Sequence, residues 1–277
     1  MIPLVITTTI RESLASIAGA ICEVWESDVD TPAVYAEQCR VHQADLQHSV
    51  MAFTPDGQLV GIGILCRRGQ HGYVLDFGIV PGWRGQGLGH QVFAALVAQA
   101  REAGIAALSL VVRSDNVAAQ SIYRKAGFET VRTLETLRGK RVAFAPAQAR
   151  EVTDRVPEVV QAWFGGGKSG HPGWERDLPS ILAMADARVF EVQHALMMVR
   201  PSPYFRRLDI VQLALDAEAT QEDVNALMHA AGEAFDPRLP FALVDEPPES
   251  RAHRLLLDLG FRVVERNFEM KLTLQDS

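Results

Sequence analysis

The sequence has few cysteines, no long hydrophobic run and no excess of basic residues, and each shortage excludes a class of protein. Three cysteines among 277 residues are too few for a disulfide framework, which favours a reducing compartment. The longest apolar stretches, such as VFAALVAQA, fall short of the roughly 18 residues that a membrane-spanning helix needs. The N-terminal stretch lacks the basic start of a signal peptide. We therefore expect a cytoplasmic protein that has no membrane partner.

Charge and composition narrow the classes further. The formal net charge is −7, which gives no electrostatic reason to expect a nucleic-acid partner and suits a cationic acceptor. With 48% hydrophobic and 22% charged residues, the chain has the composition of a folded globular protein. Its length predicts two domains, each large enough to bury its own core.

Hydrophobic periodicity predicts an alternation of helices and strands. We expect amphipathic helices over 11–26 and 33–47, two strands within 49–66, a strand over 72–80, a helix from Gly87 to near Gly104, a strand over 107–112, a helix over 116–127 and a final hairpin that turns at Arg138-Gly139-Lys140. This order predicts an α/β (α+β) fold with a mixed, mostly antiparallel sheet flanked by helices.

Three glycines lie within five positions at the point where the strand over 72–80 gives way to a helix. A strand that enters a glycine loop and a helix that leaves it form an anion site, because the first amides of the helix lack partners. The spacing of Gly85, Gly87 and Gly89 differs from the G-x-G-x-x-G of dinucleotide sites, and the loop lacks the Lys of a P-loop. A second glycine-rich stretch, 162–170, follows a helical segment and not a strand, so we expect a connecting loop there.

Two stretches together resemble the GCN5-related N-acetyltransferases. Arg84-Gly85-Gln86-Gly87-Leu88-Gly89 matches the acetyl-CoA loop pattern Q/R-x-x-G-x-G/A of that family, and it follows the strand end Ile79-Val80-Pro81. The stretch 116–128 is similar to the family's N-x-x-A-x-x-x-Y helix, which ends here at Gly127-Phe128. The resemblance covers about residues 4–145.

The resemblance implies acetyl-CoA as the co-substrate and no metal. It implies that the backbone amides of residues 84–90 hold the pyrophosphate, that the strand end takes the pantetheine arm as an added strand, and that the amide of Ile79 polarises the thioester carbonyl. The cofactor-binding residues it implies are Ile79, Val80, Pro81, Arg84, Gly85, Gln86, Gly87, Leu88, Gly89, His90, Asn116 and Ala119. For Asn116, a helix N-cap is an equally open interpretation.

The resemblance also implies that Tyr123 is the general acid that protonates the departing thiolate; the alternative is a tyrosine packed in the core. The base is open. Val111 stands where ribosomal-protein acetyltransferases of the family carry a glutamate. Asp76 is the best remaining carboxylate, with a water-mediated proton transfer and a purely structural strand-edge Asp as alternatives.

The second half of the sequence resembles the first. Residues 248–272 are similar to the helix and strand that begin at Asn116, with Gly260-Phe261 on Gly127-Phe128, an offset of 133. This offset places Leu256 on Tyr123, and it places 217–222, which has no glycine, on the acetyl-CoA loop. We therefore expect a catalytic domain over 1–145 and a degenerate copy without an acetyl-CoA loop over 146–277, an arrangement similar to mycothiol synthase and related tandem acetyltransferases.

These observations predict an acetyl-CoA-dependent N-acetyltransferase that acts on a primary amine of a small molecule or peptide by direct attack. The alternative is a regulatory module that binds CoA or acyl-CoA without turnover. The sequence leaves the oligomeric state open, with a homodimer as one alternative. It predicts no metal site, because Cys39 and His42 share a helix face but no second pair of ligands lies nearby.

Overall fold

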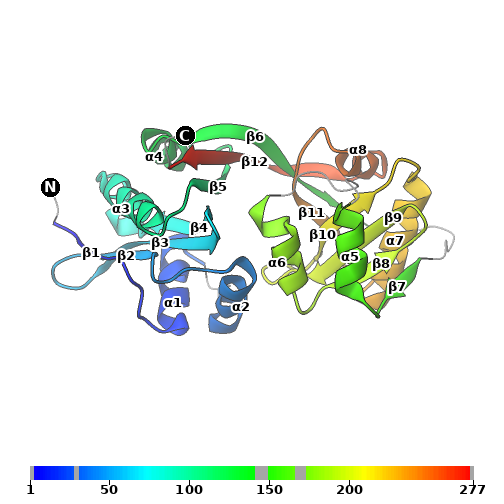
Figure 1. Ribbon diagram of the computed structural model, residues 1–277, viewed down its shortest axis with the longest axis horizontal. Coiled ribbons are helices and arrows are strands. Elements are labelled where there is room, and N and C mark those ends of the chain that lie inside the picture. Colours follow the sequence, from blue (N-terminus) through cyan, green and yellow to red (C-terminus); the bar gives the residue numbers. More distant parts are fainter. Residues whose placement is uncertain (1–2, 28–30, 141–148, 166–172, 275–277) are drawn as a thin grey trace. The chain divides into compact units, whose positions relative to one another are not determined.

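A computed structural model describes residues 3–27, 31–140, 149–165 and 173–274. Contacts divide the chain into two compact units: residues 1–131 together with 268–277 form the first, and 132–267 form the second. The predicted boundary between residues 145 and 146 and residues 166–170 of the glycine-rich stretch lie outside the described residues. Residues 162–165, expected to belong to a loop, are the last turn of a helix. Figure 1 shows the elements of both units.

The first unit follows the predicted alternation of helices and strands. Its elements are β1 (Val5–Thr7), α1 (Leu14–Trp25), α2 (Pro32–His42), β2 (Val50–Phe53), β3 (Leu59–Arg68), β4 (His71–Ile79), the 3₁₀ turn η1 (Pro81–Trp83), α3 (Leu88–Glu102), β5 (Ala107–Arg113), α4 (Val117–Lys125) and the start of β6 (Glu129–Gly139). Helix α2 ends five residues earlier than expected, because Gln43 adopts a left-handed conformation as its C-cap.

The second unit repeats the same order, which confirms the predicted duplication. Its elements are β7 (Arg150–Val152), α5 (Val156–Gly165), the 3₁₀ turn η2 (Trp174–Arg176), α6 (Leu178–Ala183), β8 (Arg188–Glu191), β9 (Ala195–Pro201), β10 (Leu208–Leu215), α7 (Gln221–Ala234), β11 (Phe241–Glu246), α8 (Arg251–Asp258) and β12 (Arg262–Thr273). Gly127 and Gly260, the matched glycines after α4 and α8, share a left-handed conformation with φ of 95° and 85°.

In both units the helices pack on a mixed β-sheet. The first unit has the strand order β1-β2-β3-β4-β5-β12 and the second has β12-β6-β11-β10-β9-β8-β7. Neighbours are antiparallel from β1 to β4, whereas β4 and β5 run parallel, as do β10 and β11. The last strand of the first unit is therefore the second half of β12, which follows the second unit in the sequence.

The expected hairpin at Arg138-Gly139-Lys140 is wrong. Arg138 and Gly139 continue β6 and lie opposite Ala242 and Phe241 of β11. A Cβ atom on Gly139 would lie 2.3 Å from the ring of Phe261, so this glycine serves the close approach of an aromatic side chain and not a turn.

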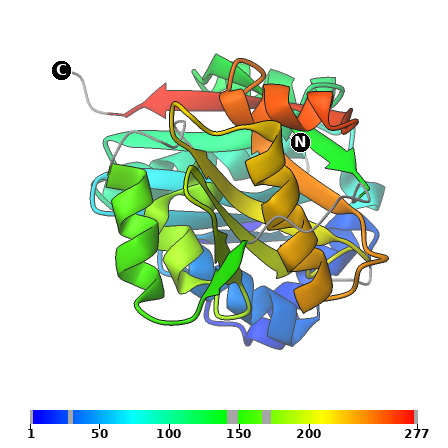
Figure 2. The same cartoon turned by 90° about the vertical axis from the view of Figure 1, so that its right-hand side faces the viewer.

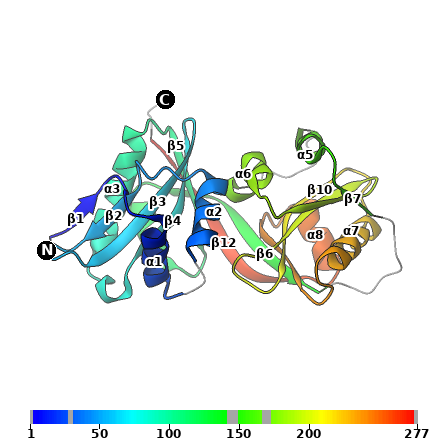
Figure 3. The same cartoon turned by 90° about the horizontal axis from the view of Figure 1, so that it is seen from below.

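Each sheet has an apolar core on both faces. In the first unit, α3 and α4 cover one core and α1 and α2 cover the other; Figure 3 shows α1 and α2 beside strands β2 to β4. In the second unit the matching pairs are α7 with α8 and α5 with α6, and Figure 2 shows α5 and α7 on opposite sides of the yellow strands. Within the described parts of the chain, none of the helices is long and apolar enough to cross a membrane.

Candidate active site

Strands β4 and β5 part shortly after they begin to pair. Their parallel register is recorded for His71↔Ala107, Gly72↔Leu108 and Tyr73↔Ser109, after which β4 continues to Ile79 and β5 to Arg113. Leu75 is an extra residue in β4, because Ile64 pairs with Asp76 while Leu65 pairs with Val74. A bulge of this kind bends the strand and increases its twist. The bulge therefore opens a wedge between the two strands.

The backbone of β4 presents polar groups to this wedge. The amide of Val80 donates to the oxygen of Val60 on β3 (2.9 Å). Hydrogen-bonded and non-bonded pairs alternate between antiparallel strands. Ile79 opposite Gly61 and Phe77 opposite Gly63 therefore turn their amides away from β3 and towards the wedge. This edge can accept an extended ligand as an added strand, as the sequence predicted for the pantetheine arm.

The glycine loop follows β4 and ends at the first turn of α3. Gly85 and Gly87 have φ of 77° and 76°, a left-handed conformation that favours glycine, and Gly87 is the N-cap of α3 without any side-chain cap. Among the described residues, no hydrogen bond is donated by the amides of Gly85, Gln86, Gly87 or Leu88. These amides, together with the helix dipole, can bind an anion.

Gly89, the third glycine of the motif, has a packing role. A Cβ atom on Gly89 would lie 2.7 Å from Cδ1 of Ile122, so Gly89 permits the close packing of α3 on α4. Leu88 beside it is buried in the same core. His90 is half-buried in the first turn of α3, where its amide has no carbonyl within the helix to which it could donate.

Arg84 holds the end of β4 in place. Its Nε donates to the oxygen of Ile79 (2.9 Å) and its Nη2 to the oxygen of Val24 at the end of α1 (2.6 Å), while its own amide donates to Pro81 (3.2 Å). Pro81 opens the turn η1, and Val80 before it is buried. Arg84 thus fixes the loop through its side chain, a role that the sequence pattern alone does not reveal.

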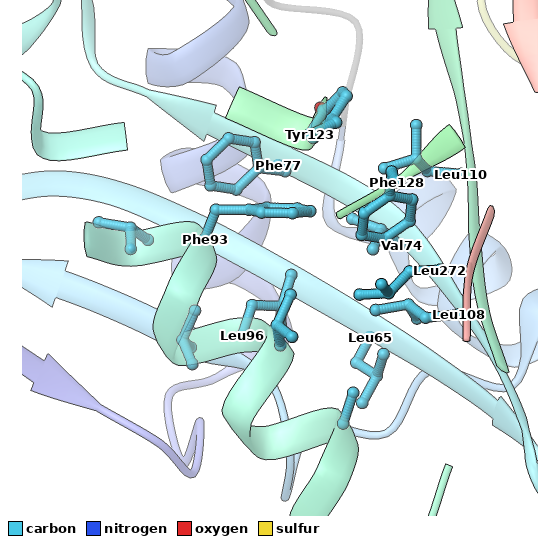
Figure 4. Packing of buried hydrophobic residues seen from close by; sticks show 14 of the residues in the cluster. Leu65, Val74, Phe77, Phe93, Leu96, Leu108, Leu110, Tyr123, Phe128 and Leu272 are labelled. Atoms are coloured by element: carbon cyan, nitrogen blue, oxygen red, sulfur yellow. The ribbon is translucent and has the colours of Figure 1, made fainter. Parts of the chain in front are cut away.

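Tyr123 lies on α4 within an aromatic cluster. Its ring centroid is 4.9 Å from that of Phe93, 6.0 Å from that of Phe77 and 6.2 Å from that of Phe128, and Figure 4 shows these side chains together. Burial raises the pKa of Tyr123 above its ordinary value. The phenol is therefore protonated at neutral pH and can act as a proton donor.

The start of α4 is fixed by two polar side chains. Asn116 is the N-cap, and its side chain accepts a hydrogen bond from the amide of Ala119 (3.1 Å). Gln120 donates through Nε2 to the oxygens of Arg113 and Ser114 (both 3.0 Å) and so closes the end of β5 onto the helix. Asn116 therefore has a structural role, and Ala119 packs against the core beside it.

Asp76 directly follows the bulge, on the side of the sheet that α1 and α2 cover. Its Oδ2 accepts a hydrogen bond from the hydroxyl of Tyr35 on α2 (2.9 Å). Burial, followed by the charge of Asp76, raises the pKa of Tyr35 above its ordinary value and the pKa of Cys39 to about 11. The sequence analysis missed Tyr35. The available signal was a single aromatic residue on the buried face of the predicted helix.

The second unit has the same bulge but a shorter loop. Val211 is the extra residue of β10, since Ile210 pairs with Val199 and Gln212 with Met198. The bulge residues Leu75 and Val211 are 136 positions apart, whereas the N-caps Gly87 and Thr220 are 133 apart. The loop before α7 is therefore three residues shorter, and Gln212 stands at the position of Asp76.

Helix α7 also satisfies its own first turn. The Thr220 side chain accepts from the amide of Asp223 (3.3 Å), and the Asp223 carboxylate accepts from the amide of Thr220 (2.8 Å), which completes a capping box. The amides of Thr220 and Asp223, at the N-cap and third position of α7, thus have carboxylate and hydroxyl partners, and a second anion there would meet a negative charge.

Arg176 fills the wedge of the second unit. The last recorded parallel pair of β10 and β11 is Ile210↔Leu243, and beyond it the guanidinium donates to the oxygens of Val211 (2.9 Å), Val244 (2.9 Å) and Asp245 (3.2 Å). It also donates to the side chains of Gln212 (3.1 Å) and Glu246 (2.6 Å). Arg176 is 8% exposed. One side chain therefore bonds to both strands at the place where β10 and β11 part.

Comparison with known proteins agrees with this geometry. Residues 14–128 match the model of the acetyltransferase (GNAT) family. A segment of 60 residues is 40% identical to the uncharacterized N-acetyltransferase YycN of Bacillus subtilis; it covers 22% of this chain and 38% of the length of that relative. Among the described residues, no group of three or more His, Cys, Asp or Glu side chains could hold a metal ion.

Two solved structures match nearly the whole chain. A GCN5-related N-acetyltransferase from Sphaerobacter thermophilus is 16% identical, with a TM-score of 0.68 over 99% of this chain and 96% of that chain. A tandem GNAT protein from the clavulanic acid biosynthesis pathway is 11% identical, with a TM-score of 0.67 over 99% of this chain and 100% of that chain. At these identities the likeness concerns the fold, and it confirms the expected tandem architecture.

The buried contacts of Arg176 lead to a stability prediction. Replacement of Arg176 by Met leaves Glu246 buried and without this partner, so we expect the free energy of unfolding to fall by about 3–5 kcal/mol. Arg238→Met is the matched control: its side chain is 80% exposed and paired with Asp236, and we expect little change, because exposed ion pairs contribute little to stability. Chemical denaturation of both variants measures the difference, and equal effects would contradict the role of Arg176.

Proposed function

We propose that the chain transfers an acetyl group from acetyl-CoA to a primary amine, because residues 14–128 match the model of the acetyltransferase (GNAT) family. The observation that carries the proposal is the wedge between β4 and β5, which leads directly into the unbonded amides of the glycine loop. The wedge can accept an extended group as an added strand, and the loop can bind an anion. These two requirements fit the pantetheine arm and the pyrophosphate of CoA, respectively.

The residues around the wedge have different roles in binding acetyl-CoA. The amides of Gly85 to His90 hold the pyrophosphate, and those of Phe77 and Ile79 bind the pantetheine arm and the carbonyl of the acetyl group. Arg84 keeps the strand end and the loop in register through its bonds to Ile79 and Val24. Bound acetyl-CoA supplies the thioester that reacts.

Two side chains of the first unit move the protons. Asp76 takes one proton from the acceptor ammonium, which frees the nitrogen lone pair for direct attack on the carbonyl carbon. The amide of Ile79 stabilises the negative charge that develops on the carbonyl oxygen. As the new C–N bond forms and the C–S bond breaks, Tyr123 protonates the thiolate and recovers a proton from the nitrogen. The products are an N-acetylated amine, CoA thiol and the proton that Asp76 releases to solvent.

We assign the chemistry to the first unit alone. In the second unit the loop is three residues shorter, Thr220 and Asp223 cap the helix, Arg176 fills the wedge, and Gln212 and Leu256 replace the proposed base and acid. Each difference removes one requirement for CoA binding or for catalysis. The second unit is thus a degenerate copy without an acetyl-CoA site.

The experiment that tests the proposal combines binding with turnover. Isothermal titration with acetyl-CoA measures binding, and release of CoA thiol in the presence of a panel of primary amines, including peptides with a free N-terminus, measures transfer. We expect binding and thiol release with at least one amine. Binding without thiol release across the panel would favour the alternative of a CoA-binding regulatory module, and absence of binding would refute the proposal.

The role of Tyr123 leads to a kinetic prediction. Tyr123→Phe keeps the ring in its aromatic cluster and removes only the proton donor. We expect kcat to fall about 10²–10⁴-fold while the affinity for acetyl-CoA stays nearly unchanged. Steady-state kinetics and titration measure the two quantities. A kcat within about threefold of the wild-type value would show that Tyr123 only packs in the core.

The difference between the units leads to a stoichiometry prediction. The chain should bind one acetyl-CoA, and Gly87→Glu should abolish binding, because it places a carboxylate at the anion site. Gly57→Glu is the matched control: Gly57 has a similar φ of 87° and open space around it in the turn between β2 and β3, so it carries the same strain and charge away from the loop. Two bound molecules per chain, or residual binding by Gly87→Glu, would contradict the assignment.

A further inference from the structure

A buried phenol touches the carboxylate that we assign as the base. Tyr35 is 1% exposed on α2, and its hydroxyl donates to Oδ2 of Asp76 over 2.9 Å. The two residues are 41 positions apart in the sequence. The fold brings them together directly after the bulge of β4.

The pair lies at an apolar core that also holds two thiols. Helix α2 contributes Cys39, and β3 contributes Cys66. The other buried hydrophobic side chains of this core, from the segment before α1, from α1, from β2 and β3, and from the end of β4, are Ile10, Ile17, Ala18, Ala20, Ile21, Val24, Met51, Ile62, Ile64 and Val80. Burial, followed by the charge of Asp76, raises the pKa of Cys39 to about 11, so this thiol stays neutral. The hydrogen bond from Tyr35 to Asp76 is therefore made at the edge of a hydrophobic core.

The chemistry of the pair suits a base that must stay ionised. Burial disfavours the ionised form of a carboxylate, whereas a hydrogen bond donated to it favours that form. Burial also raises the pKa of Tyr35 above its ordinary value, so the phenol remains a donor throughout the physiological pH range. A phenol has one rotatable hydrogen, and its donation fixes the orientation of the carboxylate that accepts it.

We propose that Tyr35 is a positioning residue for acetyl transfer: its hydroxyl holds the Asp76 carboxylate ionised and in the orientation from which it takes a proton from the acceptor ammonium. This inference rests on the proposed function of Asp76 as the base. In each cycle Asp76 gains one proton from the ammonium and returns it to solvent, and Tyr35 keeps its own proton throughout.

The second unit gives an independent comparison. Gln212 stands at the position of Asp76, and its side chain accepts from Arg176, which belongs to η2 between α5 and α6. A neutral amide there needs no donor that holds it ionised. The contact between the helical layer and the post-bulge residue is thus present in both units, but only the first unit joins a titratable carboxylate to a neutral donor.

The test measures the titration of Asp76 directly. Carbon-13 NMR of protein labelled at aspartate carboxyl carbons follows Asp76, whose signal is identified by its absence from Asp76→Asn. In Tyr35→Phe the midpoint should rise by about one pH unit, because the ionised form loses its donor. The signal of Asp56, in the exposed turn between β2 and β3, is the internal control in the same spectra, and its midpoint should stay unchanged.

Activity provides the second measurement. With an amine identified by thiol release, the acid side of the kcat/KM profile of Tyr35→Phe should move upwards by the same amount as the NMR midpoint. An unchanged midpoint, or a shifted midpoint with an unchanged profile, overturns the role of Tyr35. If Tyr35→Phe does not fold, global incorporation of 3-fluorotyrosine, a stronger donor, should lower the midpoint, and no change overturns the role.

Failure of the proposed function is recognised separately. Absence of acetyl-CoA binding refutes acetyl transfer whatever the NMR midpoint shows. An Asp76→Asn variant that binds acetyl-CoA and keeps kcat within about threefold refutes Asp76 as the base, and with it the purpose of the Tyr35 contact, while acetyl transfer itself stands.

Discussion

The early parting of two parallel strands is the constraint on which the rest of the structure depends. Where β4 leaves β5, and where β10 leaves β11, backbone groups that a continuous sheet would pair are left without strand partners. Buried backbone groups need hydrogen-bond partners. The two units meet this need in different ways: the second uses the guanidinium of Arg176, and the first, in our proposal, uses a ligand.

The same contrast continues into the helix that follows each wedge. Both α3 and α7 begin with amides that no residue of the helix can accept from. Left-handed glycines and a missing cap keep these amides accessible in α3, whereas Thr220 and Asp223 satisfy them in α7. In our proposal, a unit can bind the pyrophosphate of CoA only if the backbone amides at the start of its helix have no partner within the protein. The capping side chains determine whether they have one.

Much of this could be predicted from the sequence, because the decisive signals are local. The spacing of Gly85 and Gly87, the helix before Gly127 and the repeat at Gly260 each reflect a nearby backbone requirement, and the structure places all of them as expected. The remainder depends on contacts between distant residues. The sequence around Gly139 is typical of a turn, but in the structure this glycine packs against Phe261 of the distant C-terminal segment. Likewise, no residue near Arg176 in the sequence indicates that its side chain contacts β10 and β11. Tyr35 meets Asp76 for the same reason, across 41 positions.

The strand order also ties the fold of the first unit to residues that follow the second unit in the sequence. The first unit takes its sixth strand from residues 268–273, which follow the second unit in the sequence. Met270 and Leu272 of that strand are buried in the core that also contains Phe93, Tyr123 and Phe128. A chain that ended after the first unit would lose these side chains from the core and leave β5 with an exposed edge. The first unit is therefore completed by a strand that only a chain continuing through the second unit supplies.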